Sequence, residues 1–332
     1  MITNFGINNR GQIAIFQSTL INRNLSKDAK RDTKLSTECL GRNWGGFLYE
    51  KDGKKLLVLI DSDDGSGGTP SDCKISWSAL DDVLMTYKPH DFIILKSKIN
   101  IDPEFNQFYP FKKDIHPIGI FSDDPNRIFH VKSSIQKPSL QDIDVFFSGG
   151  LKFKNFRPWV WPKERDLKKW YPGASMRGYN KLLEIRDKRP DLNIKIFDQV
   201  LNPNEFYGLI SRSKICIDFP GVGLSSRKFY EYLVLGKCVL ALRQQLTPWP
   251  CEENIHYCSM GMDLDFSNME EKIDLLLTND SFRKNIESNV SNIENDLTLE
   301  SMVKRVEKII NDKIDSIDIN SKTLYVNIDK FY

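Results

Sequence analysis

Residues 214–242 read KICIDFPGVGLSSRKFYEYLVLGKCVLAL, which is the pattern of one strand-loop-helix-strand unit. The apolar run that ends at Phe219 is typical of a strand covered on both faces. Gly221 and Gly223 allow a turn after it, and Gly236 ends the following helix before a second apolar run begins. Since a helix joins the two strands, the stretch predicts an open α/β sheet with a ligand crevice at the carboxyl ends of its strands.

The same alternation continues on both sides of this stretch. Short runs rich in β-branched and aromatic residues lie at 56–60, 92–95, 145–147, 194–197, 215–219 and 239–242. Amphipathic segments follow several of them, at 175–186, 204–211 and 225–235. Strands that alternate with helices imply parallel sheets with helical crossovers, so we predict the α/β class with doubly wound sheets.

The length of 332 residues favours two domains at about 150 residues each. A polar stretch at 132–142 separates the early strands from the later ones, so we place an N-terminal domain at 1–142. The second domain is predicted at 143–310 because its helical pattern continues to that point. Residues 311–332 are predicted to form a tail that packs back on the first domain.

The composition excludes several classes of protein. With 47 Lys and Arg against 45 Asp and Glu, the net charge of +2 gives no field that would coat nucleic acid. No apolar stretch approaches the roughly 20 residues that cross a bilayer, and the N-terminus has no leader pattern. The six cysteines lack CxxC spacing, which argues against a zinc site or a disulfide framework. We therefore expect a cytoplasmic protein with no membrane span and do not expect a nucleic-acid partner. A transferase that modifies DNA bases, which would need a basic cleft, stays open as an alternative.

The predicted helix start after Gly223 carries a phosphate-binding pattern. Ser225 or Ser226 provides the helix cap, and a helix N-terminus attracts anions through its free N–H groups. Arg227 adds a planar fork for a diphosphate, and Glu231 follows one turn later on the same face, where a carboxylate accepts both hydroxyls of a ribose. A plain surface ion pair between Arg227 and Glu231 explains the same spacing, so both interpretations stay open here.

Residues 217–242 resemble the nucleotide-binding segment of exostosin-type glycosyltransferases and, more loosely, of other GT-B glycosyltransferases. The matching positions are Ser225, Arg227, Glu231 and Gly236, between two apolar strands. The resemblance implies two Rossmann-like domains facing a cleft, with a nucleoside-diphosphate sugar on the C-terminal domain and the acceptor on the other. It also implies inversion at the anomeric carbon without a catalytic metal or other cofactor. One departure is Tyr232, where that family has a small residue.

Three further positions in this half are candidate contacts to the nucleotide sugar. Gly149 follows the run 145–147 and precedes a basic stretch that contains Arg157, which would bring cations to a leaving diphosphate. Arg177 follows a turn near the start of the amphipathic segment 175–186. A solvated basic loop explains the stretch after Gly149 equally well.

In the first half, the apolar run 56–60 leads directly into the acidic cluster of Asp61, Asp63 and Asp64. Carboxylates at the end of a strand lie at the crevice edge, where one can act as general base toward an acceptor hydroxyl. The same oxygen ligands also suit Mg²⁺ or Mn²⁺ bound with a diphosphate, which is the less favoured alternative. An acidic glycine-rich turn without catalytic function is the third interpretation.

Together with these features, the resemblance implies a glycosyltransferase that moves a hexosyl or pentosyl group from a UDP- or GDP-linked sugar to a hydroxyl of a glycan or glycoconjugate. Inversion is expected. A retaining GT-B transferase, or a non-catalytic module that binds a nucleotide or a sugar, fits the same pattern.

Overall fold

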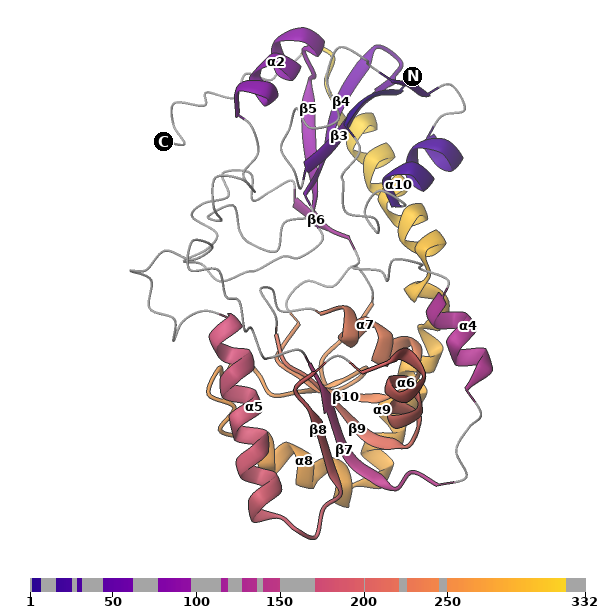
Figure 1. Cartoon of the computed structure of the whole chain (residues 1–332). Helices are drawn as coiled ribbons and strands as arrows, with labels where there is room; N and C mark the ends of the chain where they lie inside the picture. The colour runs from indigo at the N-terminus through magenta and orange to yellow at the C-terminus, as the bar shows by residue number, and fades with distance from the viewer. Residues whose placement is uncertain are drawn as a thin grey trace. The chain divides into compact units, whose positions relative to one another are not determined.

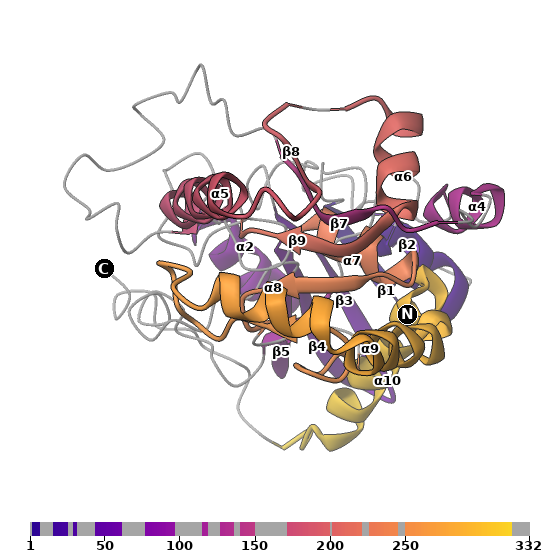
Figure 2. The same ribbon diagram turned by 90° about the horizontal axis from the view of Figure 1, so that it is seen from below.

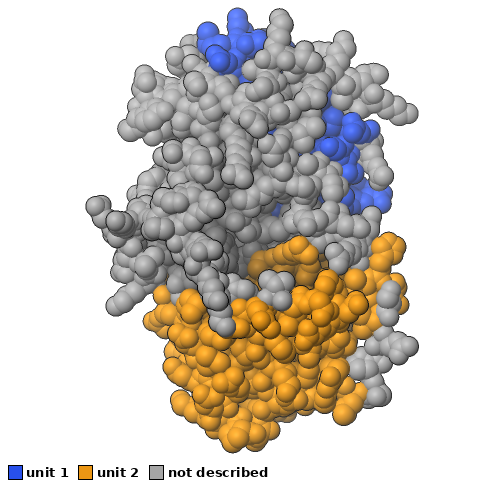
Figure 3. Space-filling model, viewed as in Figure 1, with its two compact units in different colours: residues 1–123, 299–332 blue, residues 124–298 orange. Residues whose placement is uncertain are grey.

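The computed structural model divides the chain into two compact units, one of residues 1–123 with 299–332 and the other of residues 124–298 (Figure 3). The structure describes residues 2–6, 16–25, 29–31, 44–61, 77–96, 115–118, 127–135, 140–149, 171–199, 201–220, 226–244 and 250–320. The domain limits predicted at 142 and 310 stay predictions. In the described residues, no helix is both long enough and apolar enough to cross a membrane.

The first unit contains a six-stranded sheet of order β2-β1-β3-β4-β5-β6 (Figure 1). Its strands are β1 (Ile2–Gly6), β2 (Ala29–Arg31), β3 (Trp44–Lys51), β4 (Lys54–Asp61), β5 (Asp91–Lys96) and β6 (Ile115–Pro117). Its helical elements are η1 (Leu20–Leu25), α2 (Trp77–Tyr87) and α10 (Leu299–Ser316). Strands β4, β5 and β6 are parallel, as the sequence predicts, whereas β3 runs antiparallel to both β1 and β4.

Strands β3 and β4 are antiparallel because a tight hairpin joins them. Its two turn residues, Asp52 and Gly53, both have positive φ, at 51° and 77°. Two consecutive residues of this kind form the turn whose twist matches that of paired strands. The N-terminal sheet is therefore mixed and not wholly parallel, because a two-residue turn leaves no room for a helical crossover.

Helix α10 packs on the first unit, against β4 and η1. Its apolar stripe is buried, and its polar residues bind the sheet: Lys51 pairs with Asp315 at 2.7 Å and Lys313 with Asp91 at 2.8 Å. The C-terminal helix therefore returns to the N-terminal part of the chain. The predicted tail reaches beyond residue 320, outside the described residues.

The second unit contains a five-stranded parallel sheet of order β11-β10-β9-β7-β8. Its strands are β7 (Ile143–Ser148), β8 (Ile194–Phe197), β9 (Ser213–Asp218), β10 (Cys238–Ala241) and β11 (Cys258–Ser259). Its helices are α4 (Arg127–Ser134), α5 (Tyr171–Lys188), α6 (Pro203–Ser211), α7 (Arg227–Val234), α8 (Met269–Thr278), α9 (Asp280–Asn292) and the short η4 (Glu294–Leu297). Helix α8 contacts both α5 and α9 (Figure 2). The predicted α/β class with parallel sheets is confirmed.

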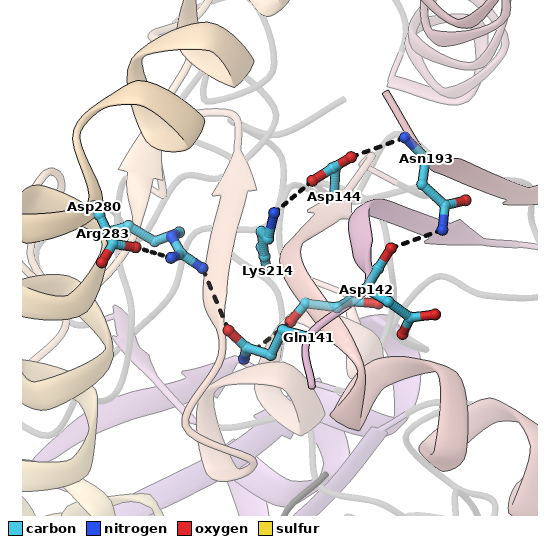
Figure 4. A network of polar contacts seen from close by, with 8 residues as sticks. Gln141, Asp142, Asp144, Asn193, Lys214, Asp280 and Arg283 are labelled. Atoms are coloured by element: carbon cyan, nitrogen blue, oxygen red, sulfur yellow. Dashed lines mark hydrogen bonds and ion pairs between the residues drawn. The ribbon is translucent and has the colours of Figure 1, made fainter. Parts of the chain in front are cut away.

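A polar network holds the amino ends of β7 and β9 (Figure 4). The Asp144 carboxylate accepts a hydrogen bond from Lys214 Nζ at 2.7 Å and another from the backbone N–H of Asn193 at 2.8 Å. Arg283 of α9 binds Asp280 and donates to the Gln141 side chain at 3.4 Å. These contacts fasten the starts of β7 and β9 to neighbouring loops and to α9.

The first half of α5 packs tightly on the end of β9. A Cβ added at Gly178 would lie 2.6 Å from two ring carbons of Phe219. That ring cannot move aside easily, since it is buried between Phe147, with ring centroids 4.7 Å apart, and Phe266, at 5.2 Å. The absent side chain at Gly178 therefore sets the distance between helix and strand.

We expect Gly178→Ala to lower the free energy of unfolding by about 1–3 kcal/mol, because overpacking forces the aromatic cluster to shift. The matched control is Gly208→Ala in the middle of α6, where an added Cβ meets nothing within 4 Å. That variant should gain about 0.5–1 kcal/mol, since alanine loses less backbone entropy in a helix. Urea unfolding of both variants measures the two effects, and an equal change in both would contradict the packing argument.

Candidate active site

The candidate site lies where the order of the parallel sheet reverses, between β7 and β9 (Figure 1). Strand β7 is followed in sequence by β8 on one side of it, and β9 by β10 on the other. In open α/β sheets, ligands bind outside the strand ends at such a reversal. The register pairs Phe146 with Cys216, which brings Ser148 level with Asp218 at this edge. We call the ends of β7 and β9, the first turn of α7 and Glu231, one turn further along that helix, the carboxyl-edge site.

Ser226 fixes the start of α7 to the end of β9. Its hydroxyl donates to the Asp218 carboxylate at 2.6 Å and accepts from the backbone N–H of Phe229 at 3.2 Å. The second contact is a helix N-cap, and the first holds that cap beside the strand end. Of the two serines predicted to cap the helix, Ser226 does so, while Ser225 lies outside the described residues.

Helix α7 also ends at the glycine where the sequence predicts that it ends. Gly236 has a φ of 68°, in the left-handed region that glycine adopts without strain. Its N–H donates to Leu233 O at 2.8 Å, and Lys237 N–H donates to Tyr232 O at 3.0 Å, which closes the helix. The helix that carries the candidate residues is therefore fixed at both ends.

Arg227 and Glu231 form the ion pair that their spacing allows. Arg227 Nε donates to Glu231 Oε1 at 2.8 Å. The two side chains differ in exposure, at 43 % for Arg227 and 4 % for Glu231. A surface ion pair would leave both groups in water, whereas here the carboxylate is buried and only the guanidinium reaches solvent. A buried carboxylate costs free energy unless it is paired, and Arg227 supplies the pairing.

Lys228 is a second cation at this site, and the sequence analysis did not select it. Its ammonium donates to the backbone carbonyl of Ser148 at 2.6 Å and lies 4.8 Å from the ring centroid of Phe147. Burial lowers the pKa of the ammonium below its usual value, and the carboxylates of Asp218 and Glu231 partly offset this. The first turn of α7 thus directs a desolvated cation toward the end of β7.

Gly149, predicted as a ligand contact, lies against Lys228. A Cβ added there would lie 3.1 Å from Lys228 Nζ and 2.9 Å from the Phe147 ring. The Gly149 N–H donates to Phe197 O at 2.9 Å, which holds the backbone in place. Glycine at this position therefore leaves the space in which the ammonium sits.

Arg177 is the second of the predicted phosphate-binding arginines that the structure describes, and its side chain binds a loop. Its Nε donates to Leu264 O at 2.9 Å and lies 3.2 Å from the Asp265 carboxylate. Its Nη2 is buried and, within the described part of the chain, has no hydrogen-bond partner. The loop continues to Phe266, a buried residue with a positive φ of 57° that packs on Phe219. Arg177 thus anchors a strained loop, and its role toward phosphate stays a prediction.

Tyr232, the departure from the glycosyltransferase pattern, has a packing role. Its side chain is fully buried and lies 6.3 Å from the ring of Phe206 in α6. The residue fills the space between α6 and α7 that a small side chain would leave open. Tyr232 therefore contributes to the packing of α7 on α6, while Glu231 remains paired with Arg227.

Several predicted site residues cannot be placed. Asp61 ends β4, but the description does not extend to its side chain. The others lie wholly outside the described residues: Asp63, Asp64, Arg157, Gly221, Gly223 and Ser225. In the part of the chain that the structure does describe, no group of three or more His, Cys, Asp or Glu side chains is arranged to hold a metal ion.

Several solved structures are similar to this chain. A glycosyltransferase from Rickettsia africae gives a TM-score of 0.37 at 15 % identity, over 68 % of this chain and 64 % of that enzyme, so the match spans less than two thirds of its length. Anabaena HepE in complex with UDP gives 0.40 at 13 % identity, over 71 % and 68 %. The pneumococcal O-GlcNAc transferase GtfA, in complex with UDP and GlcNAc, gives 0.37 at 9 % identity, over 82 % and 70 %.

No protein-family model and no curated protein matches the chain. The TM-scores of the three structures lie below 0.5. The function is therefore inferred from the chain's own residues.

Proposed function

We propose that the chain is a glycosyltransferase of the GT-B type, which moves a hexosyl or pentosyl group from a UDP- or GDP-linked sugar to a hydroxyl of a glycan or glycoconjugate. The observation that carries the proposal is the Arg227–Glu231 pair, which joins the first turn of α7 to the second, with its carboxylate 4 % exposed beside the carboxyl ends of parallel strands. An exostosin-like donor site and a cytoplasmic location are part of the proposal.

The two cations of α7 have separate tasks in binding the donor. Arg227 is half exposed, so its planar fork can contact the two phosphates, and the helix N-terminus adds favourable partial charge. Lys228 brings a second, less solvated positive charge to the same edge. Glu231 has four lone-pair positions, which allows its carboxylate to accept ribose hydroxyls while it holds Arg227.

Transfer then proceeds by displacement at the anomeric carbon. An aspartate of the cluster Asp61, Asp63 and Asp64 removes the proton of the acceptor hydroxyl, whose oxygen attacks from the face opposite the nucleotide. The bond from the anomeric carbon to the phosphate oxygen breaks, and its electron pair stays on the leaving diphosphate. Arg227 and Lys228 stabilise the charge that builds there, with Arg157 and Arg177 as further candidates. With cations from the protein at the diphosphate, neither Mg²⁺ nor Mn²⁺ is required.

A panel of UDP- and GDP-linked sugars tests the proposal. We expect one nucleotide to raise the melting temperature of the protein, and its sugar to be consumed with release of free nucleotide. Release should continue in EDTA. Nucleotide binding without release would favour a non-catalytic binding module, and a product with the donor's anomeric configuration would favour a retaining enzyme. If no UDP or GDP compound binds, the proposed donor is wrong.

A further inference from the structure

Asp218 is a buried carboxylate of the carboxyl-edge site to which the proposed function gives no task. It is the last residue of β9, directly after the apolar run 215–217, and its side chain belongs to a residue that is only 1 % exposed. A carboxylate at such a position costs free energy unless hydrogen bonds or a positive charge compensate it. The groups around Asp218 therefore indicate what it does.

The first turn of α7 is tied to two neighbouring strands, and Asp218 provides one of the ties. Its carboxylate accepts a hydrogen bond from the Ser226 hydroxyl at 2.6 Å, which fixes the helix cap to the end of β9. Two residues later, Lys228 Nζ donates to Ser148 O at 2.6 Å, at the end of β7. Since the register of the two strands brings Ser148 level with Asp218, the ammonium and the carboxylate lie at the same edge of adjacent strands.

Asp218 and Glu231 are the two carboxylates, among the described residues, whose charge acts on Lys228. Burial lowers the pKa of the ammonium, and these carboxylates raise it, Asp218 more than Glu231. Glu231 also holds Arg227, at 2.8 Å. The groups of β7 that contact the ammonium, the Phe147 ring and a backbone carbonyl, are uncharged. The larger part of the balancing charge therefore comes from Asp218.

We propose that Asp218 is a positioning residue of the carboxyl-edge site, whose carboxylate holds the cap of α7 through Ser226 and balances the buried positive charge of Lys228. Without this carboxylate the ammonium would lose its proton more readily, and a neutral amine brings no charge to a phosphate. Asp218 thus widens the pH range in which Lys228 binds phosphate. The inference rests on the proposed function for the identity of the ligand, a nucleoside diphosphate or its sugar, but not for the interaction of Asp218 with Lys228.

Asp218→Asn tests the inference because it removes the charge and keeps an oxygen that accepts the Ser226 hydroxyl. With ¹³C- and ¹⁵N-labelled lysine, NMR follows the titration of Lys228, whose signal is the one that Lys228→Met lacks. In the protein without nucleotide, this titration should shift to lower pH in Asp218→Asn. The matched control is Asp144→Asn at the amino end of β7, where the carboxylate binds Lys214 at 2.7 Å. That variant should leave the titration of Lys228 unchanged.

Nucleotide affinity gives a second readout, which a purely structural residue would not change in this way. At acid pH, Lys228 is charged in both proteins. Asp218→Asn should then bind UDP or GDP at least as tightly as the wild type, because a negative charge near the phosphates has been removed. At alkaline pH the variant retains less of the Lys228 charge, so its affinity should be about tenfold below that of the wild type. Calorimetric titration over this pH range measures both effects.

A double variant keeps the inference testable if Asp218→Asn does not fold. Asp218→Asn with Lys228→Met removes both charges, so it should be more stable in urea than Asp218→Asn alone, which leaves a buried ammonium without its balancing charge. Equal stability of the single and double variants would overturn the inference, and so would a Lys228 titration that Asp218→Asn does not shift. If the titration shifts but no UDP or GDP compound binds, the proposed donor is wrong, while the interaction of Asp218 with Lys228 is supported.

Discussion

Replacing Arg227 by alanine should lower the rate of nucleotide release from the sugar donor by about 100- to 1,000-fold, the effect of removing one group that stabilises charge in a transition state. The guanidinium is the most exposed charge in the first turn of α7, and it is held in position by Glu231 at 2.8 Å. It is therefore placed to contact the leaving diphosphate, where negative charge accumulates. A coupled assay for free UDP or GDP measures the loss.

A second variant separates this effect from a loss of folding. Arg227→Ala leaves the buried Glu231 carboxylate without its partner, which destabilises the fold. Arg227→Lys keeps a positive charge beside Glu231 but loses the planar fork, so it should fold as the wild type does and still lose about tenfold or more in rate.

The matched control is Arg212→Ala. Arg212 is 49 % exposed and pairs with Asp142 before β7, at the amino edge, so its removal should leave the rate unchanged. A normal rate in Arg227→Lys and in Arg227→Ala would show that the pair is structural.

Most of the second unit could be predicted from its sequence because its strands are short apolar runs and its helices have clear ends. β8 lies at Ile194–Phe197, as expected, and Gly236 ends α7 where the pattern indicated. In the first unit, β3 was not predicted because Gly45 and Gly46 interrupt its apolar pattern. That strand is defined by pairing with β1 and β4, which its own residues do not indicate.

In the candidate site, too, some contacts follow from the sequence and others depend on the folded chain. Arg227 and Glu231 lie one helical turn apart, so their pairing follows from spacing alone. The contact of Lys228 with Ser148 joins residues 80 positions apart, and its pKa depends on burial that only the folded chain produces. In the sequence, Lys228 is one more cation at a helix start. The sequence does place Lys228 between the candidate residues Arg227 and Glu231. That position does not indicate which way the lysine side chain points.

Replacing Lys228 by methionine should weaken the binding of UDP or GDP by about 10- to 100-fold, because one charged hydrogen bond to a phosphate is lost. Stability should change little. Methionine keeps most of the side-chain volume and removes an ammonium whose lowered pKa shows that the fold disfavours its charge. Removal of the disfavoured charge should stabilise the fold, whereas loss of the hydrogen bond to Ser148 O should destabilise it, so the two effects offset each other. Calorimetric titration and urea unfolding measure the two quantities.

The pH dependence of binding identifies the group responsible. Because the folded protein holds the pKa of Lys228 below that of an exposed lysine, wild-type affinity should fall as the pH rises through this lowered pKa. The Lys228→Met variant should lack that fall. Lys214→Met, which removes a comparable ammonium bound to Asp144 at 2.7 Å on the amino edge, should bind nucleotide normally and keep the fall. If Lys228→Met instead loses stability and binds nucleotide with wild-type affinity, this lysine only caps the end of β7, and Arg227 is left as the sole cation of α7 at the phosphates.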